Sequence, residues 1–304
     1  MIDPLALIDP QDLIDPLALI DPLHDPLSLI EPQADIDPRA IVDTSAVIDP
    51  RAVIDPGVRI AAGVHVGPYS VIGPDVEIGE GTWIGPHVVL NGPTRIGCDN
   101  RIHQFCSLGD DPQDKKYRGE RAETHLQIGD RNTIREYCTM NRGTVQGGGV
   151  TRIGDDNWIM AYVHVAHDCI IGNHTVFANG ASLAGHVVVE DHAILGGFTL
   201  VHQFCRIGAY SFSAFSSTIA KDLPPYMMVS RESAKAHGLN REGLKRHGCN
   251  PKTIDILRRA YRILYRENLT VAESLARLSE MVEECPEVQR LVDFVAQSTR
   301  GIIR

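Results

Sequence analysis

The segment Ile72-Gly73-Pro74-Asp75-Val76-Glu77-Ile78-Gly79-Glu80-Gly81-Thr82-Trp83-Ile84 places an aliphatic residue at every sixth position. The same spacing runs without a break from Ile30 to Leu108. A period of six is neither the 3.6 of an α-helix nor simply the 2 of a β-strand, and it is typical of hexapeptide repeats. The repeat therefore predicts a mainly β protein, built as a left-handed parallel β-helix.

Each six-residue unit has the same internal order: an aliphatic residue, a turn dipeptide, and a small or β-branched residue at the fifth position. The turn dipeptides Asp-Pro, Gly-Pro and Gly-Glu bend the chain, because proline fixes φ and glycine tolerates positive φ. The first and fifth positions of a unit can both point into a narrow core. Three units then form one triangular coil, and each coil covers the apolar end of the next.

The six-residue phase is lost near residues 110–125 and again near 143–151, and it runs on to Ile219 afterwards. We predict that both segments are loops excluded from a rigid prism, which are natural places for a site. For the first loop a functional role is favoured over a tolerated insertion. For the second, which contains Gly147-Gly148-Gly149, both readings are equally open.

The repeat also divides the chain into three parts. Residues 1–29 are an acidic Ile-Asp-Pro extension, either extra coils or a poorly ordered segment. Residues 30–222 form the β-helix, and residues 223–304 form a helical domain. Helices are expected over 252–264, over 271–284, and from Pro286 to about 298, because apolar residues recur there at spacings of three and four.

The composition excludes several classes of protein. The chain has 304 residues and a net charge of −10, and no nucleic-acid-binding motif is present, so nucleic acid is an unlikely partner. No run of about 18 apolar residues exists, which predicts no transmembrane segment. Seven scattered cysteines without a CxxC pair fit a reducing cytoplasm. Flat apolar sides of a triangular prism favour assembly into a homotrimer, with sites in the grooves between subunits.

Histidines recur at the spacing of one coil. His186 follows His167 by 19 residues and His202 follows it by 35, so the three side chains should stack along one edge of the prism. Histidine is the side chain best suited to exchange a proton near neutral pH. A histidine column can serve as a general base in a substrate groove, or it can hold zinc as in β-helical carbonic anhydrases. A third reading is a scaffold without catalysis.

Several motifs resemble one family closely, the UDP-N-acetylglucosamine O-acyltransferases of lipid A biosynthesis. Coverage runs from about residue 35 to residue 304. The N-terminal Ile-Asp-Pro extension departs from the family. The motifs that carry the resemblance include Gln113-Asp114-Lys115-Lys116-Tyr117, Gly143-Thr144-Val145-Gln146-Gly147-Gly148-Gly149, Ala166-His167-Asp168, Leu183-Ala184-Gly185-His186, Val201-His202-Gln203 and Glu242-Gly243-Leu244-Lys245-Arg246.

The resemblance implies a cytoplasmic homotrimer that moves an R-3-hydroxyacyl chain from acyl carrier protein to the 3-OH of UDP-N-acetylglucosamine, without a cofactor or metal. It implies that His167 is the general base, that Asp168 orients or polarises it, and that the Gly185 N–H binds the oxyanion. The 3-amino sugar remains an alternative acceptor, since relatives use both. The selected acyl length is open as well.

The resemblance also implies substrate contacts. The residues that match family positions for substrate binding are Gln113, Asp114, Lys116, His164, His186, His202, Gln203, Asn240, Glu242 and Arg246. Phe215 stands where some relatives have glycine and accept a long acyl chain. Two interpretations are open for it: a ruler that shortens the accepted chain, or a ring that turns aside into the core, leaving the ruler elsewhere, for example at Phe212.

Overall fold

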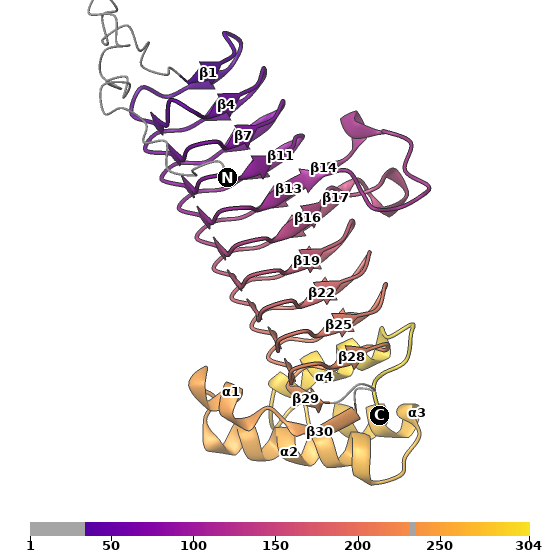
Figure 1. The fold of residues 1–304 in the computed structure, drawn as a ribbon. Coiled ribbons are helices and arrows are strands. Elements are labelled where there is room, and N and C mark those ends of the chain that lie inside the picture. The colour runs from indigo at the N-terminus through magenta and orange to yellow at the C-terminus, as the bar shows by residue number, and fades with distance from the viewer. Residues whose placement is uncertain (1–33, 231–234) are drawn as a thin grey trace, which may run out of the picture. The chain divides into compact units, whose positions relative to one another are not determined.

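The computed structural model describes residues 34–230 and 235–304, and over these residues the chain is a parallel β-helix followed by helices (Figure 1). Three sheets form the sides of the prism, and they are called sheets A, B and C here. The predicted fold class is therefore confirmed. The expectation for residues 1–29 lies outside the described residues.

The strands are short, and each coil contributes one to each sheet. Sheet A holds β1 (Asp35–Ile36), β4 (Val53–Ile54), β7 (Val71–Ile72), β10 (Val89–Leu90), β13 (Ser107–Asp110), β16 (Thr139–Asn141), β19 (His164–Val165), β22 (Ser182–Leu183), β25 (Leu200–Val201) and β28 (Thr218–Ile219). Sheet B holds β2 (Ile41–Val42), β5 (Arg59–Ile60), β8 (Val76–Ile78), β11 (Thr94–Ile96), β14 (His125–Ile128), β17 (Val150–Ile153), β20 (Ile170–Ile171), β23 (Val188–Val189) and β26 (Arg206–Ile207).

Sheet C contains the one antiparallel pairing described. Its strands are β3 (Val47–Ile48), β6 (His65–Val66), β9 (Trp83–Ile84), β12 (Arg101–Ile102), β15 (Thr133–Ile134), β18 (Trp158–Ile159), β21 (Val176–Phe177), β24 (Ile194–Leu195), β27 (Phe212–Ser213), β29 (Met227–Ser230) and β30 (Lys235–Leu239). Strands β29 and β30 pair antiparallel, and the described pairings within the prism are parallel. This final hairpin does not follow the six-residue pattern and was not expected.

The register explains the period of the sequence. Val53 pairs with Val71 and Ile54 with Ile72, so equivalent residues of neighbouring coils lie 18 positions apart. The second residue of such a strand points inward, and Ile54 and Ile72 are almost fully buried. The first residue points outward, because successive side chains of a strand alternate between its faces. One aliphatic residue in six is thus enough to line each side of the core.

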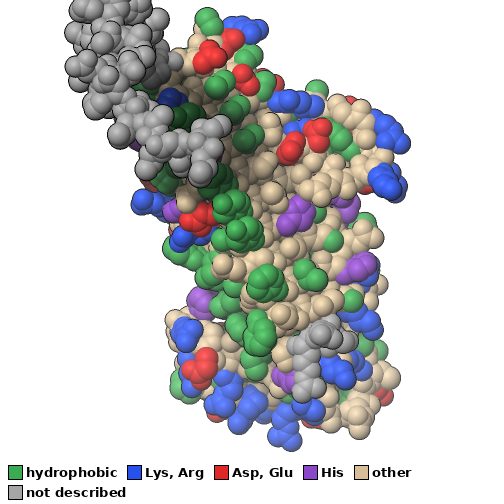
Figure 2. All heavy atoms as spheres, viewed as in Figure 1, with side chains coloured by type: hydrophobic (Ala, Val, Ile, Leu, Met, Phe, Trp, Pro, Cys, Tyr) green, Lys and Arg blue, Asp and Glu red, His purple; other side chains and the backbone are tan. Residues whose placement is uncertain are grey.

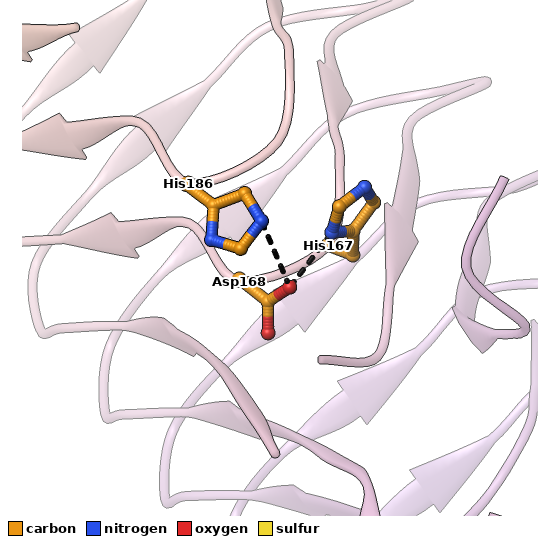
Figure 3. Close-up of side chains that lie close together, drawn as sticks. All are labelled: His167, Asp168 and His186. Atoms are coloured by element: carbon orange, nitrogen blue, oxygen red, sulfur yellow. Dashed lines mark hydrogen bonds and ion pairs between the residues drawn. The ribbon is translucent and has the colours of Figure 1, made fainter. Parts of the chain in front are cut away.

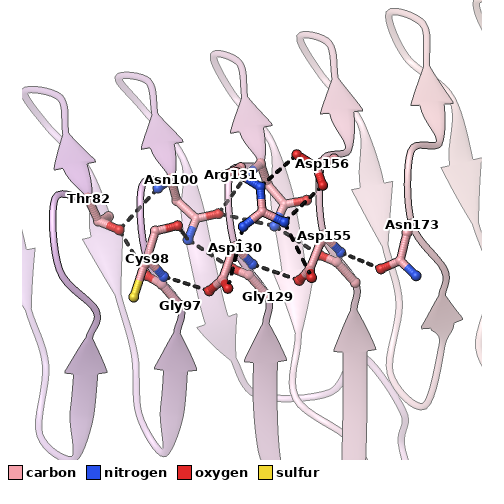
Figure 4. Close-up of polar contacts among 12 residues, drawn as sticks. Thr82, Gly97, Cys98, Asn100, Gly129, Asp130, Arg131, Asp155, Asp156 and Asn173 are labelled. Atoms are coloured by element: carbon pink, nitrogen blue, oxygen red, sulfur yellow. Dashed lines mark hydrogen bonds and ion pairs between the residues drawn. The ribbon is translucent and has the colours of Figure 1, made fainter.

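Polar side chains connect the coils at the turns (Figure 4). At the surface, the carboxylate Oδ1 of Asp130 accepts from the Cys98 N–H at 2.8 Å, and Asp155 Oδ1 accepts from the Asp130 N–H at 2.9 Å. Deeper in the prism, the Asn132 N–H donates to Asn100 Oδ1 at 2.9 Å. These ladders pair backbone N–H groups that the turns would otherwise leave without an acceptor.

Three edges separate the sheets, and they locate the functional residues. The A–B edge is the line of turns that lead from sheet A to sheet B, and the B–C and C–A edges are defined in the same way. Non-glycine residues such as His186, with φ of 61°, adopt left-handed conformations at these turns. The His186 N–H then donates to the His167 carbonyl of the preceding coil at 3.0 Å. This bond between coils offsets the strain of the conformation, about 1–2 kcal/mol per residue.

Two loops interrupt the prism, and both leave it at the A–B edge. The first spans residues 111–124 between β13 and β14, and the second spans residues 142–149 between β16 and β17. They contain the short 3₁₀ helices η2 (Arg121–Glu123) and η3 (Val145–Gly147).

The C-terminal helices close one end of the prism. They are α1 (Arg241–Arg246), α2 (Pro251–Arg266), α3 (Val271–Ser279) and α4 (Glu287–Ala296). Helices α2 and α4 follow the expected spans closely. Helix α3 ends five residues before the expected position, and α1 was missed because six residues are too few to show a helical period. No helix within the described residues is long and apolar enough to cross a membrane.

Candidate active site

The A–B edge gathers the histidine column that the sequence predicts. His167 and Asp168 follow β19, and Gly185 and His186 follow β22 one coil later. His202 and Gln203 follow β25 at the next coil. Because both excluded loops leave the prism at this same edge, loop residues and histidines share one side of the molecule.

His167 and Asp168 form the centre of the cluster (Figure 3). The Nδ1 atom of His167 lies 2.7 Å from Asp168 Oδ2, and the Asp168 side chain is 1% exposed. An ionised carboxylate can only accept, so Nδ1 carries the proton of a neutral imidazole. The Nε2 atom of His167 is then left as a proton acceptor.

The second excluded loop fixes the carboxylate. The Thr144 N–H donates to Asp168 Oδ1 at 2.8 Å, and the Thr144 hydroxyl donates to Oδ2 at 2.7 Å. Burial by itself would raise the pKa of Asp168, but the hydrogen bonds from His167 and Thr144 outweigh it and hold the pKa below its usual range. Asp168 is therefore a carboxylate at neutral pH. The role of Thr144 was missed, because nothing in its local sequence shows which group it will face.

His186 completes the cluster. Its Nε2 lies 3.5 Å from Asp168 Oδ2, and its ring stacks on Phe204 with centroids 4.5 Å apart. Burial lowers the pKa of His186, whereas the charges of Asp168 and Asp114 act to raise it. Asp114 of the first excluded loop is thus close enough to act on the histidine column.

The donor atoms of His167, Asp168 and His186 lie within 4.8 Å of one another, which is compatible with a metal ion. Both carboxylate oxygens of Asp168 already accept hydrogen bonds from Thr144, and Oδ2 also faces the His167 N–H. The carboxylate of Asp168 is therefore fully hydrogen-bonded within the protein, whereas His167 Nε2 keeps a free lone pair. The same three residues thus have the geometry of an acid–base pair as well as that of a metal-ligand set.

Gly185 lies directly against the imidazole of His167. A Cβ at position 185 would stand 2.6 Å from His167 Cε1 and 2.8 Å from Nε2, distances that real side chains do not adopt. Within the described residues, the Gly185 N–H donates to no backbone carbonyl. A backbone N–H without such a partner is available to donate to a ligand, as an oxyanion donor does.

The other predicted residues on this side of the molecule lie on β19, in the turn after β25 and on the first excluded loop. Thr139 Oγ1 lies 2.8 Å from His164 Nδ1, and burial lowers the pKa of His164. His202 is exposed, with its Nδ1 3.2 Å from the Gln203 carbonyl oxygen. Gln113 and Lys116 are exposed on the first loop. His202, Gln113 and Lys116 are thus open to solvent on the same side of the molecule as His167.

The predicted nucleotide-binding residues lie elsewhere in a single chain. Helix α1, which carries Glu242 and Arg246, ends at the B–C edge, where the His247 ring lies 4.6 Å from that of His192. Asn240 caps this helix: its Oδ1 accepts from the Gly243 N–H, and its Nδ2 donates to the Tyr210 carbonyl. Both polar groups of Asn240 are thus engaged in the fold. One chain does not bring α1 and His167 to the same edge.

Phe215 lies on the third edge. It belongs to the C–A turn between β27 and β28, and its side chain is 78% exposed. It does not turn aside into the core of its own chain, so that placement of the ring is wrong, while the position of the ruler stays a prediction. The sequence could not show this, because core and surface phenylalanines look alike at a turn.

Two protein-family models match this chain. A family model described as bacterial transferase hexapeptide (six repeats) matches residues 57–92 and 151–185. A model described as UDP N-acetylglucosamine O-acyltransferase, domain 2, matches residues 222–303. The coils and their histidine–carboxylate pair thus define a hexapeptide-repeat acyltransferase.

Relatives identify the family within this class. The chain is 58% identical over 246 residues to the acyl-[acyl-carrier-protein]–UDP-N-acetylglucosamine O-acyltransferase of Thiobacillus denitrificans, covering 81% of this chain and 95% of the relative. The enzyme of the same name from Halorhodospira halophila is 59% identical with the same coverage. The chain belongs to the family of acyl-[acyl-carrier-protein]–UDP-N-acetylglucosamine O-acyltransferases.

Solved structures agree with this assignment. The enzyme LpxA from Acinetobacter baumannii superimposes with a TM-score of 0.78 at 46% identity, covering 89% of this chain and all of that one. The UDP-N-acetylglucosamine acyltransferase of Francisella novicida gives a TM-score of 0.77 at 40% identity, covering 88% and 94% of the two chains.

Proposed function

We propose that this chain moves an R-3-hydroxyacyl group from acyl carrier protein to the 3-OH of UDP-N-acetylglucosamine, the first step of lipid A biosynthesis, with His167 as general base. Family membership gives the reaction class. The observation that carries the role of His167 is its bond to the buried Asp168, which leaves Nε2 as the proton acceptor.

The chemical step follows from this arrangement. Nε2 of His167 takes the proton of the sugar hydroxyl, and the oxygen attacks the thioester carbonyl. The N–H of Gly185 donates to the oxyanion of the tetrahedral intermediate. Collapse breaks the C–S bond, and the leaving thiolate takes the proton back from Nε2. A general base typically contributes about 10²–10⁴ in rate and an oxyanion donor about 10²–10³.

Substrate binding is assigned to the residues around this centre. Gln113, Asp114 and Lys116 on the first loop, with His164 and His186, would contact the sugar and the acyl chain. His202 and Gln203 extend the groove along the A–B edge. Glu242 and Arg246 would hold the UDP portion, since a guanidinium suits phosphate geometry. Asn240 would act there mainly by capping α1.

The exposed faces support a homotrimer that completes this site. Sheet C presents Val47 and Trp158, which are 58% and 45% exposed, and sheet B presents the arginines Arg59, Arg95 and Arg152 beside the exposed Ile41 and Ile170. Exposed rings are also stacked along the C–A edge, where Tyr137 and Tyr162 have centroids 4.8 Å apart. An apolar edge flanked by two sheets suits a three-fold axis.

With the C–A edge at that axis, sheet A of one copy faces sheet C of the next copy. The A–B edge of the first copy then lies across the groove from the B–C edge of the second. This arrangement brings His167 toward α1 of the neighbouring copy. It accounts for the separation of the two groups of substrate-binding residues within one chain.

The carrier protein would approach from the helical end. Helix α2 carries Arg258, Arg259, Arg262 and Arg266, and Figure 2 shows basic side chains gathered at that end of the visible face. Such a patch steers an acidic partner. The cytoplasm is the expected location, because all seven cysteines are free thiols, as is usual in a reducing compartment.

The first experiment measures acyl transfer from an R-3-hydroxyacyl carrier protein to UDP-N-acetylglucosamine, with wild type and His167→Ala compared. We expect activity that falls at least about a hundredfold in the variant, the range for losing a general base. No transfer by wild type, with several chain lengths and with the 3-amino sugar also offered, would contradict the proposed reaction.

A further inference from the structure

Arg142 is a buried cation that the reaction itself does not use. It follows β16 at the start of the second excluded loop, and its side chain is 1% exposed. Taking a guanidinium out of water is costly unless it is paired and hydrogen-bonded. The groups that hydrogen-bond to Arg142 therefore indicate which part of the structure this buried charge holds in place.

The guanidinium binds groups directly before the first excluded loop, at its start and near its middle. Nη1 donates to the Gly109 carbonyl, and Nη2 donates to the Asp111 carboxylate and to the Tyr117 hydroxyl, the last at 3.2 Å. The Tyr117 hydroxyl in turn donates to Asp111 Oδ1 at 3.3 Å. The neighbouring Asn141 adds a bond from Nδ2 to the Asp111 carbonyl at 2.8 Å.

These contacts enclose the substrate-binding segment. Gln113, Asp114 and Lys116 lie between Asp111 and Tyr117, the two loop residues whose side chains Arg142 holds. The first loop contains only the single 3₁₀ turn η2 as regular structure. A loop with so little structure of its own takes its position from the contacts that neighbouring segments make with it.

The same loop faces the catalytic histidines. The charge of Asp114 acts on His186, which lies against the His167–Asp168 pair. Two residues after Arg142, Thr144 binds the Asp168 carboxylate. One short segment, residues 142–144, thus connects the substrate loop on one side with the acid–base pair on the other.

We propose that Arg142 is a positioning residue for acyl transfer, which fixes residues 111–117 so that Gln113, Asp114 and Lys116 face the substrates. The proposal rests on the proposed function for the identity of those substrates. Arg142 itself, being buried, touches neither substrate. Its loss should therefore weaken substrate binding more than it slows the chemical step.

Two measurements test this. Trypsin cuts after Lys115, Lys116 and Arg118, which are all exposed, so the rate of cleavage reports how firmly the loop is held. Steady-state kinetics separates KM from kcat. We expect Arg142→Met to raise the cleavage rate and the KM by about tenfold or more, the range for losing hydrogen bonds to a charged group, with a smaller change in kcat.

If Arg142→Met does not fold, substitutions of its two partners in the loop test the same contacts. Asp111→Asn and Tyr117→Phe each remove one partner, and Asp111 is 60% exposed, so the fold should tolerate its change. Arg142→Met combined with Asp111→Asn should be no worse than Arg142→Met alone, because both remove the same contact. Arg142→Lys keeps the charge, so its increases in cleavage rate and KM should be smaller than those of Arg142→Met.

Asp49→Asn is the matched control, because it removes a carboxylate paired with Arg51 at 2.9 Å in an N-terminal coil. It should keep wild-type cleavage and kinetics. Wild-type cleavage rates and KM in both Asp111→Asn and Tyr117→Phe would overturn the proposal. If wild type shows no acyl transfer at all, the proposed function fails. The trypsin test still applies in that case: faster cleavage of the variants than of wild type means that Arg142 holds the loop, and an unchanged rate means that it does not.

Discussion

At the scale of single residues, the candidate site depends on two glycines whose lack of a side chain leaves room for neighbouring groups. Position 185 has no side chain, and the His167 ring occupies the space that a Cβ there would need. Gly147 is similar, because a Cβ there would stand 2.0 Å from the Asp168 carboxyl carbon. Both glycines therefore allow the side chains of His167 and Asp168 to approach the backbone closely.

Gly185→Ala should lower kcat by about a hundredfold or more, since the new methyl would displace the base or block the oxyanion donor. Acyl-transfer kinetics measures this, with thermal melting to confirm folding. Gly197→Ala is the matched control, because its Cβ would lie 3.4 Å from the nearest atom, the Asn179 carbonyl oxygen. Near-wild-type activity in Gly185→Ala would remove position 185 from the mechanism.

Phe215→Gly should shift the preferred acyl chain to a greater length. The ring is 78% exposed in one chain, so in the proposed trimer it can close the end of a groove between copies. Each additional methylene accepted is worth roughly 1–3 kcal/mol of discrimination. Transfer from carrier proteins with graded acyl chains measures the optimum. An unchanged optimum in Phe215→Gly, with a shift in Phe212→Leu, would assign the ruler to Phe212.

At the scale of elements, strands of two residues are too short to hold a sheet by themselves. The turns contribute instead, through ladders of side chains that run from coil to coil. Asn100, Asn132 and Asn157 form the inner ladder, and all three are at most 1% exposed. This ladder keeps neighbouring coils in register near the excluded loops, where the six-residue phase is interrupted.

Asn132→Ala should lower the free energy of unfolding by roughly 2–5 kcal/mol, because it leaves the Asn157 N–H and the Gly154 carbonyl without these bonds in the interior. Urea unfolding measures the change. Asn173→Ala in the outer ladder should cost less, since its bond to the Asp155 N–H is only partly buried. Equal losses in the two variants would show that burial does not set the cost.

At the scale of the whole molecule, the predicted site residues fall on three different edges. His167 lies on the A–B edge, α1 at the B–C edge and Phe215 on the C–A edge. A triangular prism cannot bring its own edges together. A ring of copies with a heterologous interface can place different edges of neighbouring copies across one groove.

Co-expression of His167→Ala with Arg246→Ala should therefore restore activity that neither variant has alone. If each site combines His167 of one copy with Arg246 of the next, random mixing leaves about one quarter of the sites intact. Acyl transfer by purified mixed oligomers measures this, with light scattering to confirm three copies. Mixed trimers without restored activity would place both residues in the same chain's site.

The sequence by itself determined the β-helix, the A–B histidine column and the spans of α2 and α4. One aliphatic residue in six specifies a coil, and a spacing close to 18 aligns side chains of neighbouring coils, so His167, His186 and His202 could be placed on one edge without coordinates. The family motifs then supplied the reaction. These features are local or periodic, and a periodic feature can be detected in the sequence alone.

Only the tertiary structure decided what each of these groups contacts. Thr144 reaches Asp168 from 24 residues away, and Arg142 reaches Asp111 from 31 residues away, across loops whose length breaks the period. The exposure of Phe215 and the capping role of Asn240 were likewise invisible. An excluded loop has no repeat to fix its path, so its contacts depend on how the chain returns to the prism.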